Sequence, residues 1–398
     1  MFGGVGLHTD NKINSIKKHE SDVINVIEDF DYTSQSEEYN ESFKNWRLRK
    51  KNKYSFNYNH NEKEKVFVDG QGFVSSTAAD AERDMLSRVF LLLGNILLGY
   101  VFIETVVEKL FIVLLDLIGF NISYSFFSGT IYGGKSEILF VKVLIGVLKY
   151  FIPITIMHLK FKMPNNVRYP SRKKSASEWA YALSVSMIIS VISSISRAYS
   201  DNSREIYNYF NSTTVDFSFL SDYQLVVFLF FDIVVVSIMN ELMFRGEAFH
   251  VLRQFGDLFA VTVTAFFSTL VICKFSLMPS SFLVSLTAGV ALLRSGSISV
   301  AIFMHMLSKL YLLGLIFIET SESPYMFLTR GFYMSVVFAF GVIIFLILAT
   351  QKKHDKVLDK NLHTYLGIKE KFKTIFSSLS LVGVLIACVF ASFWNSIA

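Results

Sequence analysis

Two pairs of titratable residues lie four positions apart within apolar stretches of this sequence. Glu241 precedes Arg245 in the first pair, and His305 precedes Lys309 in the second. Residues four apart leave the same face of a helix, and an acid on the amino-terminal side of a base forms a favourable ion pair there. Carboxylates and imidazoles are also common proton-transfer groups in enzymes. The two stretches could therefore bring acid–base chemistry to one place, provided that both are helices.

The stretches that carry these pairs are predicted to be membrane helices. Of the 398 residues, 52% are apolar and 18% are charged, and the mean hydropathy is +0.43, whereas about a quarter of the residues in soluble domains are charged. Apolar segments of about twenty residues, enough to cross ~30 Å of hydrocarbon, recur from Met85 onward. We predict an all-α polytopic membrane protein with eight or nine transmembrane helices, of which 281–293 is short enough to be a partial span. The predicted helices are 88–118, 138–158, 179–198, 223–244, 258–277, 281–293, 297–318, 331–349 and 376–397.

The chain divides into a polar region, residues 1–84, and a transmembrane domain, residues 85–398. The polar region has no basic-then-apolar secretory signal, and we expect solvated disorder there, including the basic segment 44–53 with Trp46. A contact with the membrane surface or with a partner is the alternative for this segment. Lys and Arg dominate the connections 160–174 and 352–373, which predicts that both are cytoplasmic. A multi-pass protein of the cell membrane with a cytoplasmic amino terminus satisfies this distribution.

The overall charge and the cysteines exclude several functions. The net charge of +5 comes from loops beside apolar runs, so it indicates membrane orientation and predicts no nucleic-acid partner. Cys273 and Cys388 both lie in apolar runs, which rules out a disulfide framework and a cysteine-ligated zinc module.

Ionisable residues within membrane helices are costly and are therefore functional candidates. Charges on the first, second, fourth and seventh predicted helices motivate the hypothesis of a transporter or channel. Asp232 lies nine residues before Glu241, half a turn out of phase, and is predicted to face elsewhere. His250 is predicted to be a solvated residue at the membrane interface.

Three segments resemble the CPBP family of CAAX-processing and bacteriocin-processing intramembrane proteases, also called the Abi family. These segments are Asn240-Glu241-Leu242-Met243-Phe244-Arg245-Gly246, Leu252-Arg253-Gln254-Phe255-Gly256 and Leu293-Arg294-Ser295-Gly296-Ser297-Ile298, the last of which leads to His305. The resemblance covers residues 223–318. It implies a bacterial intramembrane metalloprotease with a Glu-Glu-x-x-x-Arg motif, a second motif that ends in His, and a third motif His-x-x-x-Asn.

The family motifs are incomplete in this chain. Asn240 stands where the family has its first Glu, the presumed base, and an amide cannot take a proton from water at neutral pH. No His occurs from residue 251 to residue 304, and Lys309 replaces the Asn of the third motif. The resemblance therefore leaves Glu241, Arg245 and His305 as site residues. One His with one acid falls short of the three protein ligands of a catalytic zinc, so we expect no cofactor, or zinc with His305 as a ligand if the site is active.

These departures favour a catalytically impaired CPBP-family membrane protein that binds or regulates membrane or surface proteins. The alternative is an active endopeptidase that cleaves membrane-associated, prenylated or bacteriocin-type peptides. The transporter or channel is a second alternative. Membrane lipid and a protein partner or peptide substrate are the expected partners. Lys309 further suggests a closed network in which Glu241 is clamped by both Arg245 and Lys309.

Overall fold

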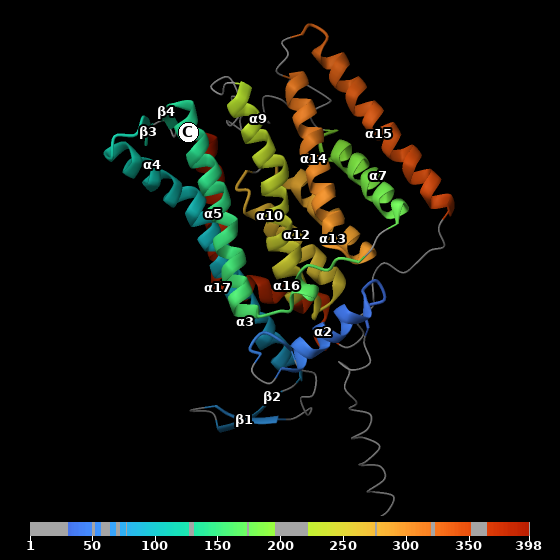
Figure 1. Cartoon of the computed structure of the whole chain (residues 1–398). Helices are drawn as coiled ribbons and strands as arrows, with labels where there is room; N and C mark the ends of the chain where they lie inside the picture. The colour runs from blue at the N-terminus through green and yellow to red at the C-terminus, as the bar shows by residue number, and fades with distance from the viewer. Residues whose placement is uncertain are drawn as a thin grey trace, which may run out of the picture.

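The computed structural model (Figure 1) is built from helices, with two short hairpins. It describes residues 31–49, 52–56, 64–68, 72–76, 78–126, 131–172, 175–195, 222–274, 277–319, 323–351 and 364–397. The predictions for residues 1–30, 173–174 and 352–363 lie outside these ranges.

The elements follow the chain in this order. Before the first long helix come α2 (Glu37–Leu48) and the antiparallel hairpin of β1 (Glu64–Val68) and β2 (Gly72–Ser76). The next part of the chain contains α3 (Ala78–Phe102), the π-helical η1 (Ile103–Val107), α4 (Glu108–Leu117), the antiparallel strands β3 (Ile122–Tyr124) and β4 (Ile131–Gly133), α5 (Lys135–Phe161), α6 (Asn165–Arg168) and α7 (Ala176–Ser193). The remainder contains α9 (Asp222–Phe230), the π-helical η4 (Phe231–Val236), α10 (Ser237–Glu241), the π-helical η5 (Leu242–Ala248), α11 (Phe249–Arg253), α12 (Asp257–Leu270), α13 (Met278–Ser295), α14 (Ile298–Glu319), α15 (Met326–Gln351), α16 (Ile368–Ser377) and α17 (Leu379–Ile397).

In the described part of the chain, fewer helices than predicted are long and apolar enough to be membrane spans. Six helices in the described part of the chain are long and apolar enough to cross a bilayer: Ala79–Leu117, Lys135–Phe161, Ala176–Ser193, Tyr223–Arg253, Ile298–Glu319 and Met326–Thr350. A seventh span arises if α16 and α17, which meet at a 72° bend, are counted together. The prediction of eight or nine spans counted α12 and α13 as well. With 14 residues, α12 is shorter than the ~20 residues that cross the hydrocarbon core.

The long helix formed by α9, η4, α10, η5 and α11 is the central element of the domain. It contains two of the π-helical segments, in which hydrogen bonds run between residues five apart and the turn is wider than in an α-helix. In Figure 1 this helix lies beside α5 on one side and α14 on the other, with α12 and α13 next to it. Gly246 lets the Tyr169 ring approach closely, because a Cβ at position 246 would lie 2.7 Å from Tyr169 Cε1.

Part of the polar amino-terminal region packs against the transmembrane domain. Tyr39, Phe43 and Trp46 lie on one face of α2 and are at most 3% exposed. The Phe43 and Trp46 rings are stacked, and Trp46 Nε1 donates a hydrogen bond of 2.8 Å to the carbonyl of Phe161 at the end of α5. The prediction that the segment around Trp46 is solvated is therefore wrong. The lone Trp in a polar sequence is a buried anchor, which spacing alone did not reveal.

Replacing Trp46 tests how firmly α2 is docked. Trp46→Ala removes a buried indole and its hydrogen bond, and such truncations cost about 3–5 kcal/mol in the free energy of unfolding. We expect the variant to melt at a lower temperature in detergent and to be cleaved faster by protease within residues 31–56. The control is Asn45→Ala, which changes an exposed neighbour on the same helix. Equal protease resistance of both variants would show that α2 does not depend on this contact.

Candidate functional site

The carboxylate of Glu241 and the ring of His305 converge between α10 and α14. His305 Nδ1 lies 2.8 Å from Glu241 Oε1, although 64 residues separate them in the sequence. Asn240 Nδ2 lies 3.3 Å from both of these atoms. The carboxylate oxygen can only accept, so His305 Nδ1–H and the Asn240 amide both donate to Glu241 Oε1. This assignment leaves His305 Nε2 as the ring nitrogen with a lone pair.

Arg245 holds the other oxygen of the same carboxylate. Arg245 Nε lies 3.2 Å from Glu241 Oε2, and both side chains are fully buried. The contact is an ion pair and not a hydrogen bond, since neither atom has a hydrogen-bond partner. Arg245 Nη2 donates to the backbone oxygen and the hydroxyl of Ser285 on α13, and the Ser285 hydroxyl contacts Ser268 on α12. Arg245 thereby joins the central helix to α12 and α13.

Lys309 does not join this network in the described part of the chain. Lys309 Nζ lies 2.8 Å from Asp232 Oδ1 and 2.8 Å from the Asp232 backbone oxygen. The predicted clamp of Glu241 by Lys309 is therefore wrong, whereas its pairing with Arg245 is confirmed.

The orientation of Asp232 also differs from the prediction. Asp232 and Glu241 both reach residues of α14, although a regular helix would place them half a turn apart. Asp232 lies in η4, which spans Phe231–Val236 between the two acids. Each residue of the wider π-helical turn advances the chain by a smaller angle than an α-helical residue does, so counting 3.6 residues per turn gives the wrong face.

Comparison with known proteins finds a family match over the part of the chain that carries these residues. Residues 222–311 match the family model described as "Rce1-like: Type II CAAX prenyl endopeptidase Rce1-like". The chain carries an Rce1-like domain of the CPBP family. The matched range begins with α9 and ends within α14, so it contains Glu241, Arg245 and His305. No curated protein matches the chain, and neither does any solved structure.

The Rce1-like domain does not offer a zinc site among the residues described. Its Glu241 oxygens are occupied by His305, Asn240 and Arg245, and the guanidinium would repel a cation at this carboxylate. No group of three or more His, Cys, Asp or Glu side chains in the described part of the chain could hold a metal ion. A catalytic zinc takes three protein ligands, so the residues present do not fit it.

A second buried acid of the Rce1-like domain was missed by the motif analysis. Glu247 is fully buried, and its Oε1 accepts hydrogen bonds from Arg168 Nη1 at 2.9 Å and from the Tyr169 hydroxyl at 3.2 Å. Burial raises the pKa of Tyr169, and the neighbouring Glu247 carboxylate raises it further. Arg168, in the basic connection after α5, therefore balances the negative charge of Glu247 in η5. Sequence spacing held no signal for this pair, because 79 residues separate its members.

His250 is buried, which corrects its predicted position in solvent. Its side chain is 0% exposed, and its Nδ1 lies 2.8 Å from the Tyr39 hydroxyl of α2. Burial raises the pKa of Tyr39, and the nearby Arg253 guanidinium opposes that rise. Arg253 in turn pairs with Asp257 at 2.8 Å. The docked α2 shields these groups from water.

The buried ion pair of Glu241 and Arg245 predicts that removing one of the two charges lowers the free energy of unfolding strongly. Glu241→Gln leaves the Arg245 guanidinium buried without a countercharge, which costs about 3–5 kcal/mol. We expect a lower melting temperature in detergent. The control Glu241→Gln/Arg245→Met, which removes both charges, is expected to recover part of the loss. If Glu241→Gln melts like the wild type, the pair does not stabilise the fold.

A double-mutant cycle tests the partner of Lys309. Asp232→Asn and Lys309→Met should be coupled by about 0.5–3 kcal/mol in the free energy of unfolding, because their side chains are in contact. Glu241→Gln and Lys309→Met should show a smaller coupling. A larger coupling between Glu241→Gln and Lys309→Met than between Asp232→Asn and Lys309→Met would instead show that Lys309 pairs with Glu241.

Proposed function

We propose that this protein is a catalytically impaired member of the CPBP family that binds or regulates membrane or surface proteins. The observation that carries the proposal is the environment of the Glu241 carboxylate. Its Oε1 accepts hydrogen bonds from His305 and Asn240, and its Oε2 forms an ion pair with Arg245. A general base needs a basic lone pair within hydrogen-bond reach of water. Glu241 is fully buried, and the position that should hold the family's base is an amide.

The contacts of the surviving motif residues support a structural role. His305, Asn240 and Arg245 neutralise one buried acid and join α10, α13 and α14. Although the chain lacks the family's base and its second-motif His, these residues still hold the helices of the Rce1-like domain together. A protein that keeps such a domain while lacking the groups that activate water can hold a peptide or protein without cutting it.

The pairing of membrane charges weighs against a transporter. Glu104 and Glu108 bond Lys149 and Lys142 at 2.8 and 2.7 Å. Asp232 bonds Lys309 in the same way. Paired charges lower the cost of burial without a passing ion, so their presence in spans does not require transport.

We further propose that the end of the domain bearing α2 is cytoplasmic. Lys160 lies in the last turn of α5, and Lys162, Arg168 and Arg172 follow in the connection from α5 to α7. The carboxyl-terminal part of α15 lies at the same end, as the ring contact of Tyr181 with Phe345 indicates. A concentration of basic residues at one end favours the cytoplasmic side of the cell membrane.

A binding and cleavage assay tests the proposed function. Purified full-length protein in liposomes is given a prenylated CAAX peptide with a dye at each end. We expect the wild-type cleavage rate to equal that of His305→Ala, while the intact peptide remains bound to the wild type. The control Leu379→Ala changes an exposed apolar residue far along the chain from the site. Cleavage by the wild type that His305→Ala or a chelator abolishes would instead establish an active endopeptidase.

A further inference from the structure

The short helix α16 crosses the end of the domain that bears α2 (Figure 1). A bend of 72° separates it from the apolar helix α17. The helix α17 runs beside α3 in the same direction, because Ser380 Oγ donates a hydrogen bond of 3.2 Å to the backbone oxygen of Leu91, and a Cβ at Gly383 would lie 3.5 Å from Leu98 Cδ1. Since α3 and α17 follow the direction of a membrane span, α16 lies closer to the membrane plane than to its normal.

The contacts of α16 place it at the level where neighbouring spans begin and end. Glu82 Oε2 accepts hydrogen bonds of 2.7 and 3.0 Å from two backbone N–H groups just before α16. Glu82 lies in the charged first part of α3, whose apolar run begins at Val89. Lys371 Nζ donates a hydrogen bond of 2.6 Å to the backbone oxygen of Phe255, in the turn where the central helix ends and α12 begins. The helix therefore lies at the boundary between polar and apolar segments, where a bilayer has its headgroups.

The buried Lys371 fixes which side of α16 faces outwards. Its side chain is 3% exposed and lies 3.5 Å from Glu82 Oε1. Lys369 and Lys373 lie two residues to either side of Lys371, so they project about 160° away from it around the helix. Both are exposed, and neither forms an ion pair within the described ranges of the chain. The outer side of α16 thus carries two positive charges that the fold itself does not neutralise.

An apolar stripe runs beside these two lysines. Ile368, Phe372 and Phe376 are spaced four residues apart and share one face of α16. Ile368 is 56% exposed and Phe376 is 64% exposed, and Leu379 continues the exposed apolar surface after the bend. The Phe372 ring contacts Phe259 at the start of α12. A helix with an apolar side next to lysines is typical of segments that lie in the membrane interface, with the apolar side among the acyl chains and the charges at the headgroups.

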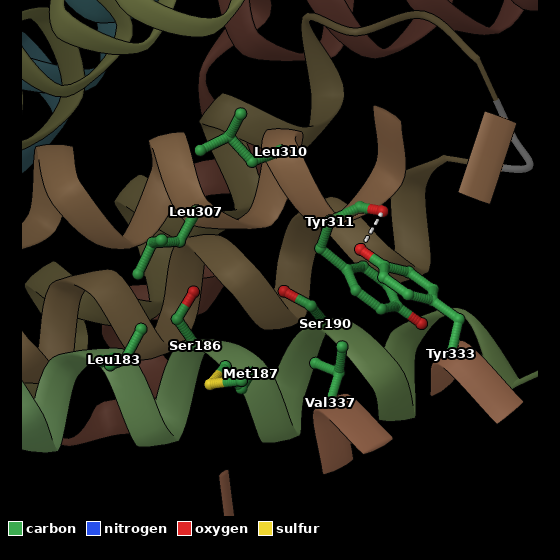
Figure 2. A pocket seen from close by; sticks show the side chains of 9 residues that line it. All are labelled: Leu183, Ser186, Met187, Ser190, Leu307, Leu310, Tyr311, Tyr333 and Val337. Atoms are coloured by element: carbon green, nitrogen blue, oxygen red, sulfur yellow. Dashed lines mark hydrogen bonds between the residues drawn. The ribbon is translucent and has the colours of Figure 1, made fainter. Parts of the chain in front are cut away.

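The pocket between α7, α14 and α15 offers no comparable charge (Figure 2). Its polar side chains are hydroxyls, namely Ser186, Ser190, Tyr311 and Tyr333, and its lining contains no Lys, Arg or His. A charged headgroup would remain without a counterion there, whereas it would meet two ammonium groups at α16.

We propose that α16 binds anionic phospholipids, with Lys369 and Lys373 at the phosphate-bearing headgroups and with Ile368 and Phe376 among the acyl chains. Each lysine near an anionic membrane surface strengthens binding by about fivefold. The basic connection after α5 lies at the same end of the domain and adds to the attraction. The proposal does not depend on whether the Glu241 site cleaves peptides.

Lipid photolabelling of the full-length protein tests this proposal. The protein is reconstituted in phosphatidylcholine liposomes that contain a trace of phosphatidylglycerol or of phosphatidylcholine, each with the same photoactivatable acyl chain, and labelled peptides are located by mass spectrometry. The measured quantity is the ratio of phosphatidylglycerol label to phosphatidylcholine label in each segment. We expect this ratio to be at least about fivefold higher in segment 376–386 than in segment 340–347 on α15, and to fall when salt is added. Both segments are apolar and uncharged, so they form a matched pair.

Substitutions of single lysines assign the preference to α16. Lys369→Gln and Lys373→Gln should each lower the ratio in segment 376–386 by about fivefold while the melting temperature in detergent stays that of the wild type. The matched control Lys135→Gln removes an exposed lysine at the start of α5, at the opposite end of that helix from Phe161, and should leave the ratio unchanged. Equal ratios in the two segments of the wild type would overturn the proposal, as would variants that keep the preference. Absence of either label from segment 376–386 would show that a protein covers this face, and would overturn it too.

Discussion

A carboxylate without any contact to water is the constraint around which the Rce1-like domain is organised. Moving an isolated ion from water into a medium of low dielectric constant costs several kcal/mol even after relaxation. Glu241 is fully buried, so charge and hydrogen bonds must come from its neighbours. They come from Arg245 one turn away, from Asn240 beside it and from His305 on α14. Because Arg245 also bonds Ser285, satisfying one acid fixes the relative positions of the central helix, α13 and α14.

The same constraint gives the motif residues a role that does not depend on hydrolysis, in line with the proposed loss of catalysis. Replacing the family's first Glu by Asn240 removes one negative charge and a potential base, while its amide donates to the acid that remains. Lys309, in the place of the third-motif Asn, neutralises Asp232. Each substitution thus balances a local charge. An electrostatic role of this kind needs neither metal nor water, and it is compatible with a protein whose task is binding.

Contacts at the end of the domain that bears α2 extend it beyond the matched range. The helix α2 lies more than two hundred residues before α11 in the sequence, yet Tyr39 bonds His250 and Trp46 bonds the end of α5. The buried pair of Arg168 and Glu247 joins the α5–α7 connection to η5. These contacts fasten the end of the central helix that follows the motif, so the position of Glu241 depends on residues outside the motif.

The sequence alone determined that the protein is helical and membrane-embedded, that Glu241 pairs with Arg245, and that the segment around them is CPBP-like. Composition, apolar length and four-residue spacing are local properties, so they can be recognised without coordinates. Only the tertiary structure decided that Glu241 meets His305, that Lys309 turns to Asp232, and that α2 is docked through Trp46. Among the described residues, it also gave six or seven helices long and apolar enough to span the membrane, fewer than the eight or nine predicted. There are two physical reasons. A π-helical turn changes which face of a helix the following residues occupy, and ion pairs between distant segments depend on how those segments pack. Neither can be read from the order of residues along one element.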